Sequence, residues 1–388
     1  MTVVAARGFR ASAVAAGLKS SGQLDLAVVV NDGPTFDVAG VFTRNRVVAA
    51  PVTWSRGVVA ARTARAVVLN SGGANACTGS VGYADAVATA HAVGRHLFVP
   101  ADQVAVASTG LIGERLAMSH VVDGVAAACA GLADGAAPAD GGADAARAIM
   151  TTDTVPKTTR VEADGFVVGG MAKGAGMLAP GLATMLSVIT TDARADAAAL
   201  DRALRTAAAR TFDRVDSDGC MSTNDTVLLL ASGASGRTPD DVALGEAVFA
   251  AASDLARQLV GDAEGSSKDI AVEVRGAACE SDAVEVARAV ARNNLFKCAV
   301  FGNDPNWGRV LAAVGTTAAA FDPASLDVSM NGVLVCRAGG VGEDRSLVDL
   351  AGREVHVVVD LHAGGATATI WTNDLTHDYV HENSAYST

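Results

Sequence analysis

Residues 171–191 read MAKGAGMLAPGLATMLSVITT and join a glycine- and proline-rich loop to an apolar run. The run LATMLSVIT (182–190) is typical of a β-strand, and Thr184 stands at its head. This threonine is either an ordinary strand residue or a nucleophile that the chain exposes by cutting itself. The rest of the sequence decides between the two interpretations.

On both sides of this stretch, short β-like runs alternate with alanine-rich helical segments. Residues 83–97 carry apolar side chains at helical spacing, and RVEADGFVVGGMA (160–172) predicts a hairpin that turns at Asp164-Gly165. A second hairpin is predicted over EVHVVVDLHAGGATATIWTND (354–374), with Gly364-Gly365 at its turn. No linker rich in proline and serine separates two autonomous units. The pattern predicts a mixed α/β protein with substantial antiparallel content.

Composition excludes several classes of protein. Half of the 388 residues are apolar and 19% are charged, which allows a large core and argues against global disorder. A net charge of −12 and only 4% aromatic residues disfavour nucleic-acid binding. No apolar stretch approaches the roughly 18 residues of a membrane span, and no signal-peptide core is present, so we expect a cytoplasmic chain.

The sequence gives no sign of a metal or a cofactor. The six cysteines are spread singly without a CxxC pair, and the seven histidines form no HExxH motif. The phosphate-loop pattern, the dinucleotide-binding GxGxxG and the hydrolase GxSxG are also missing. We therefore expect neither a metal site nor a bound cofactor.

Polar, glycine-bearing loops follow many of the apolar runs. Each loop alone is typical of a turn or a helix cap, but eight of them suggest a polar small-molecule site assembled from several loops. They are NSGGANACTG (70–79), STGLIG (108–113), MTTDTVPK (150–157), KGAGMLAPGLAT (173–184), DSDGCMSTNDT (216–226), DAEGSSKD (262–269), FGNDPNWGR (301–309) and HENSAYST (381–388).

Several of these segments, together with GFRASAVAAGLK and GVFTRNRVVAAPV, resemble the ornithine acetyltransferase (glutamate N-acetyltransferase) family of arginine biosynthesis. The resemblance covers essentially the whole chain, with the segments in the family's order. It implies a two-sheet α/β sandwich flanked by helices, like that of N-terminal-nucleophile hydrolases but connected differently.

The resemblance further implies self-cleavage between Ala183 and Thr184, which leaves an α chain of residues 1–183 and a β chain of residues 184–388. The two chains are expected to be intertwined, and to assemble as an α2β2 heterotetramer. A physical argument supports the cut independently. A threonine hydroxyl needs a base, and the α-amino group of the same residue, with a pKa of about 7.7–8.0, suits that task once it is free.

By the same resemblance, Thr184 takes the acetyl group of N2-acetylornithine and passes it to glutamate in a ping-pong cycle. Thr109 and Gly110 match the family's oxyanion hole, which acts through a hydroxyl and a backbone N–H. The substrate-binding positions of the family fall on Thr151 (or Thr152, one residue along), Lys173, Glu264, Asn383 and Thr388.

Alternative functions stay open on the residues alone. A self-cleaving threonine amidohydrolase or aminopeptidase would deliver the acyl group to water, and a non-catalytic metabolite-binding protein would use Thr184 only as a strand residue. Some relatives also use acetyl-CoA as a donor. Because no nucleotide-binding element is recognisable, the sequence favours the recycling activity alone. Trp307 and Arg309 are interpreted as packing residues.

Overall fold

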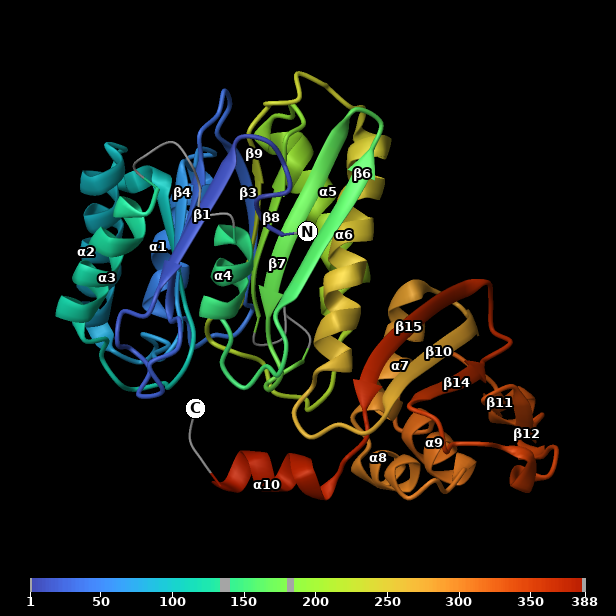
Figure 1. Ribbon diagram of the computed structural model, residues 1–388. Coiled ribbons are helices and arrows are strands. Elements are labelled where there is room, and N and C mark those ends of the chain that lie inside the picture. The colour runs from blue at the N-terminus through green and yellow to red at the C-terminus, as the bar shows by residue number, and fades with distance from the viewer. Residues whose placement is uncertain (1, 133–139, 180–184, 386–388) are drawn as a thin grey trace.

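The computed structural model describes residues 2–132, 140–179 and 185–385 (Figure 1). Ala183, Thr184 and Thr388 lie outside these described residues. Three sheets and the helices that cover them make up a mixed α/β protein, as the sequence predicts. Among the described residues, no helix is both long and apolar enough to cross a bilayer.

The strand after residue 184 lies inside a five-stranded sheet of order β3-β9-β8-β7-β6. Every residue of β8 is buried, and β8 pairs in parallel with β9 and antiparallel with β7. A strand that has a neighbour on each side and is covered on both faces usually has a nearly continuous run of apolar residues. The sequence of β8 fits this pattern. The strands are β3 (Asp37–Phe42), β6 (Lys157–Ala163), β7 (Phe166–Lys173), β8 (Leu186–Thr191) and β9 (Thr226–Ala231).

A second sheet has four strands in the order β1-β2-β4-β5. Its Val29 and Leu69 share one apolar core with Val188 and Leu228 of the five-stranded sheet, so the two sheets pack face to face. The expected two-sheet sandwich is confirmed. The strands are β1 (Phe9–Val14), β2 (Leu26–Asn31), β4 (Ala66–Asn70) and β5 (Val104–Ser108).

Helices cover the outer face of each sheet in this sandwich (Figure 1). Alternate strand residues point outward, so Ile189, next to the inward Val188, packs with α5 and α6. Asp196 and Asp240 cap these two helices, because their side chains accept from the N–H groups of Ala199 and Ala243. The helices of the sandwich are α1 (Ala50–Ala60), α2 (Gly79–Leu97), α3 (Met118–Ala130), α4 (Gly141–Ala148), α5 (Ala197–Arg210) and α6 (Asp241–Gly261).

The third sheet, which the two-sheet expectation does not include, lies beside the sandwich with its own apolar core (Figure 1). Its order is β13-β12-β11-β14-β10-β15, and Trp307 packs partly buried against its core. Its strands are β10 (Asp269–Ala277), β11 (Asp327–Met330), β12 (Val333–Arg337), β13 (Gly340–Val341), β14 (Glu354–Asp360) and β15 (Ala366–Asn373). The associated helices are α7 (Glu280–Ala291), α8 (Asn294–Phe301), α9 (Trp307–Val314) and the terminal α10 (His377–Ala385). Short 3-10 turns occur at η1 (Ala101–Gln103), η2 (Phe212–Arg214), η3 (Pro323–Ser325) and η4 (Arg345–Leu347).

The predicted hairpin over residues 160–172 is confirmed as β6 and β7, but the one over residues 354–374 is wrong. Its two strands, β14 and β15, form but do not pair with each other, because β10 lies between them. The connection between them passes over the end of β10. There the N–H groups of Ala363 and Gly364 donate to Gly276 O at 2.7 and 2.8 Å.

Leu228→Ala tests the core between the two sheets of the sandwich. Leu228 is wholly buried there, so truncation should lower the free energy of unfolding by about 2–5 kcal/mol, measured by urea denaturation. Leu347→Ala, at a side chain that is 63% exposed, is the matched control and should change stability little. Equal effects of the two substitutions would contradict this description of the core.

Candidate active site

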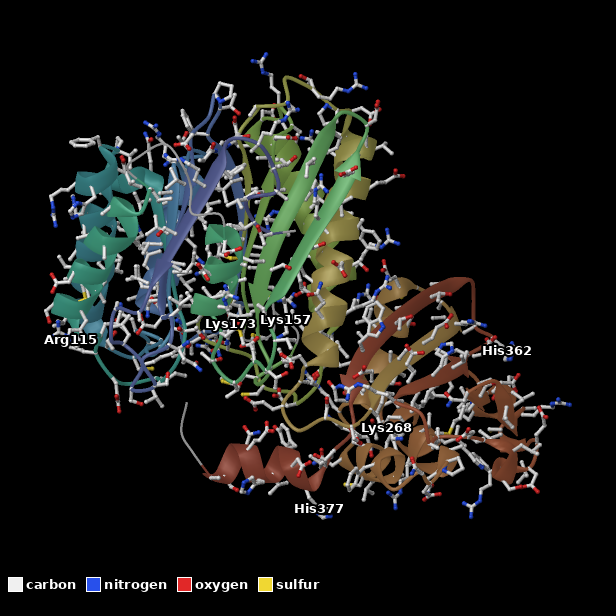
Figure 2. All side chains as sticks on the ribbon, viewed as in Figure 1. Arg115, Lys157, Lys173, Lys268, His362 and His377 are labelled. Carbon is white, nitrogen blue, oxygen red and sulfur yellow. The ribbon has the colours of Figure 1, made fainter. Side chains whose placement is uncertain are left out.

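The two sheets of the sandwich meet at one end through a buried lysine. Lys173 is the last residue of β7 and pairs with Leu186, the first residue of β8. Only 2% of Lys173 is exposed, and its Nζ donates to Thr109 Oγ1 at 3.3 Å. Thr109 directly follows β5 of the other sheet. Figure 2 shows Lys173 near Lys157, at the same end of the five-stranded sheet.

The loop at Thr109 and Gly110 is locked against the loop that follows β4. Thr109 N–H donates to Asn70 O, and Gly73 N–H donates to Thr109 O, both at 3.0 Å. Gly110 has a φ of +126°, and a Cβ there would lie 2.5 Å from Gly73 N. Only glycine fits this position, because a side chain would meet both backbone strain and a backbone clash.

Carboxylates surround the Lys173 ammonium and compensate its burial. Asp153 Oδ1 accepts from Lys157 Nζ at 2.7 Å and from Gly174 N–H at 2.6 Å. Burial alone would raise the pKa of Asp153, but Lys173 and Lys157 outweigh it and lower that pKa. Burial lowers the pKa of Lys173, while Asp153, Glu264 and Asp225 act against that lowering.

Glu264 joins three of the polar loops. Its Oε1 accepts from Thr152 Oγ1 at 2.6 Å, and its Oε2 accepts from Asn383 Nδ2 of α10 at 3.0 Å. Its backbone N–H donates to Ala175 O at 3.0 Å, in the loop after β7. Two neighbouring threonines were candidates for the substrate-binding position. Thr152 contacts Glu264, whereas the backbone N–H of Thr151 donates to Asp153. The structure brings together Lys173 at the end of β7, Asn383 of α10, and Thr109 and Glu264 from two loops.

Asp225 is a site residue that the sequence analysis missed. It is wholly buried, and its Oδ1 accepts from the N–H of Met185 at 3.1 Å. Met185 is the residue that follows Thr184 in the chain. The other carboxyl oxygen of Asp225 has no hydrogen-bond partner among the described residues. Burial raises the pKa of Asp225 well above its ordinary value. The Met185 N–H, Ser222 and Lys173 each lower this pKa, but burial outweighs them.

A cavity of about 400 Å³ opens next to Glu264, between the loop after β7 and the helices of the third sheet. This volume lies within the range of about 300–1,000 Å³ that is usual for small-molecule sites. Charged groups of both signs line it, from segments distant in sequence: Asp218, Glu264, Arg292, Lys297 and Asp374. The cavity suits a small molecule that carries charges itself.

The arrangement combines a buried cation, a hydroxyl that the cation contacts and a cavity of mixed charge. The described residues contain no cluster of three or more histidine, cysteine or acidic side chains that could hold a metal ion. The groups that are present suit a small molecule that carries charges and hydrogen-bonding groups of its own.

Known proteins match this chain in sequence over nearly its full length. A sequence model of the ArgJ family matches residues 10–388. The arginine biosynthesis bifunctional protein ArgJ of Streptomyces avermitilis is 65% identical over 387 residues, which cover 100% of both chains. The protein of the same name from Mycobacterium bovis is 55% identical over 391 residues, 99% of this chain and 96% of its own. Among solved structures, ornithine acetyltransferase of Mycobacterium tuberculosis, complexed with ornithine, matches with 50% identity. That match covers 48% of this chain and 96% of the other, with a TM-score of 0.43.

Asp225→Asn tests the buried carboxyl through the pH dependence of stability. The folded protein keeps the Asp225 proton at pH values where the unfolded chain releases it, so this group costs stability as the pH rises above about 4. Asparagine keeps the acceptor for Met185 N–H and does not titrate. The unfolding temperature of the variant minus that of the parent should therefore increase as the pH rises from about 4 to about 7. A difference that stays constant over this range would contradict the assignment.

Proposed function

The chain belongs to the ArgJ family, and we propose that it is an acetyltransferase of arginine biosynthesis. The acetyl group of N2-acetylornithine passes to a threonine of the enzyme and then to glutamate, which gives ornithine and N-acetylglutamate. The observation that carries this proposal is the contact between Lys173 Nζ and Thr109 Oγ1, at the end of the sandwich where β8 begins.

The nucleophile is Thr184, exposed when the chain cuts itself after Ala183. Its free α-amino group is then the base that takes the hydroxyl proton. The five-stranded sheet supports a cut that leaves both parts in place, because β3, β6 and β7 precede the cut while β8 and β9 follow it. Residues 1–183 and 184–388 would thus stay intertwined. We further propose their pairing as α2β2 and, because the substrates are amino acids of biosynthesis, a cytoplasmic location.

In the first half-reaction, Thr184 Oγ attacks the acetyl carbonyl carbon and its proton goes to the α-amino group. The tetrahedral oxyanion accepts from the Thr109 hydroxyl and the Gly110 N–H. The intermediate collapses, the C–N bond to ornithine breaks, and the departing nitrogen takes the proton. In the second half-reaction the neutral glutamate amine attacks the acetyl ester and gives one proton to the α-amino group of Thr184. The ester C–O bond then breaks, and Thr184 Oγ takes this proton and leaves as a free hydroxyl.

Lys173 has a specific part in this scheme. A charged ammonium can only donate, so Thr109 Oγ1 accepts from Lys173 and its own hydrogen is left for another acceptor. The hydroxyl is thereby oriented as a donor before the oxyanion forms, which is the preorganisation that stabilises a transition state. Both substrates are zwitterionic amino-acid derivatives, and the adjoining cavity of mixed charge supports their binding.

The remaining family positions are assigned to substrate binding. Lys173 suits a substrate carboxylate, Glu264 suits the side-chain ammonium of ornithine, and Thr151, Asn383 and Thr388 complete the pocket. The contact of Thr152 with Glu264 favours Thr152 as the threonine that orders this carboxylate.

The name of the relatives indicates how many activities, and so how many acetyl donors, to expect. They are called bifunctional, which speaks against the expectation of a recycling activity alone. We propose acetyl-CoA-dependent acetylation of glutamate as the second activity. The alternatives of an amidohydrolase, an aminopeptidase and a non-catalytic binding protein find no support in the family.

Thr184→Ala tests the nucleophile and the cut together. The variant should remain one uncut chain and transfer no acetyl group, as seen by denaturing electrophoresis, N-terminal sequencing and an acetylornithine–glutamate assay. Thr238→Ala, at an exposed threonine, is the matched control and should behave as the parent. Normal transfer by the Thr184 variant would overturn the proposal.

Thr109→Val tests the oxyanion hole with little change in side-chain shape. Loss of the hydroxyl should lower kcat by about 100- to 1,000-fold, as for other oxyanion donors. Thr109→Ser keeps a hydroxyl and should retain much more of the activity. If valine and serine gave the same kcat, the hydroxyl would have no part in the reaction.

A further inference from the structure

Lys297 is a buried lysine on α8 that lines the cavity beside Glu264. Only 5% of Lys297 is exposed, and its Nζ donates to the backbone oxygen of Ser217. Among the described residues, no carboxylate oxygen lies within ion-pair distance of this ammonium. A buried cation without a paired anion is costly, so an anion supplied by a ligand would stabilise it.

Among the described residues, two of the three other buried lysines differ in this respect, and the third, Lys173, donates to Thr109 Oγ1 in the site already described. Lys157 pairs with two carboxylates, those of Asp153 and Asp262. Lys268 donates to the backbone oxygens of three successive residues, Leu350, Ala351 and Gly352, at 2.6, 3.2 and 2.9 Å. These two lysines are satisfied by the protein itself, whereas the Lys297 ammonium, which can donate three hydrogen bonds, has one acceptor, Ser217 O, among the described residues.

Three other charged groups of the cavity already have partners. Arg292 Nε pairs with Asp216 at 2.8 Å, and Asp374 accepts from the N–H groups of Ser267 and Lys268 at 2.9 Å each. Glu264 accepts from Thr152 and Asn383. Burial lowers the pKa of Lys297, while the nearby carboxylates of Asp218, Asp216 and Asp374 act against the lowering and favour the charged form.

An enzyme that works by the proposed ping-pong cycle must hold two different side chains in turn. The side chain of ornithine ends in an ammonium, and that of glutamate ends in a carboxylate. A pocket with only Glu264 would attract the first and repel the second. A single cavity can serve both substrates if it offers both signs of charge from different elements.

We propose that Lys297 binds the side-chain carboxylate of the glutamate acceptor, while Glu264 serves the ammonium of ornithine in the same cavity. This inference rests on the proposed function, because it assigns the acceptor of that same reaction. Lys297 thereby sets which acceptor takes the acetyl group and has no role in forming the acetyl-enzyme.

The experiment compares two transfers that share their first half. Acetyl groups move from N2-acetylornithine either to glutamate or to isotopically labelled ornithine, so only the acceptor differs. Lys297→Met should raise the KM for glutamate roughly 10- to 100-fold, the loss of one charge-assisted contact, and should slow ornithine exchange far less. Lys297→Gln, which keeps a neutral donor for Ser217 O, should show the same imbalance if the methionine variant folds poorly.

Lys268→Met is the matched control, because it also removes a buried lysine but lies outside the cavity lining. Lys268→Met should change the rates of transfer to glutamate and to ornithine by the same factor. Equal losses of both transfers in the Lys297 variants would overturn the inference and leave the proposed function standing. Failure of the unaltered protein in both transfers would overturn the proposed function, and this inference with it.

Discussion

The buried contact between Lys173 and Thr109 is the constraint on which the rest of the site depends. It ties the end of β7 in one sheet to the loop after β5 in the other, so the two sheets must meet there. The ammonium of a lysine that is only 2% exposed is tolerated only where anions compensate it, and the nearby carboxylates of Asp153 and Glu264 do so here. The loops that carry these acids are therefore held close to Lys173. As a result, this end of the sandwich forms a polar site and not an apolar core.

The charges of the site do not simply cancel. Lys157 and Asp153 form a buried pair beside Lys173, whereas Asp225 has one carboxyl oxygen without a partner among the described residues. Lys297 likewise lacks an ion pair within that part of the chain. Buried groups that are incompletely satisfied cost folding energy and are expected where function requires them. Their pKa values are displaced in the direction of neutrality, which fits a site that handles protons and charged substrates.

The sequence predicted those parts of the fold that depend on local signals. The turn at Asp164-Gly165 lies between the strands that it connects, so that hairpin was predicted correctly. The strands on either side of Gly364-Gly365 are separated by β10, which lies about 80 residues earlier, and no local pattern reports such an insertion. Within the site, the resemblance to a family named Thr109, Lys173 and Glu264. Asp153 and Asp225 were missed, although they lie in polar loops singled out from the sequence, because their burial and partners arise only in three dimensions.

The proposed mechanism carries the acetyl group on a threonine made reactive by cleavage of the chain. The most direct measurement is peptide mass spectrometry of the enzyme after a brief exposure to N2-acetylornithine without an acceptor. We expect one acetyl group on the peptide that begins TMLSV, at Thr184, and its removal when glutamate is added. An acetyl group on a different residue, or an active enzyme whose peptides run unbroken from residue 183 to residue 184, would contradict it.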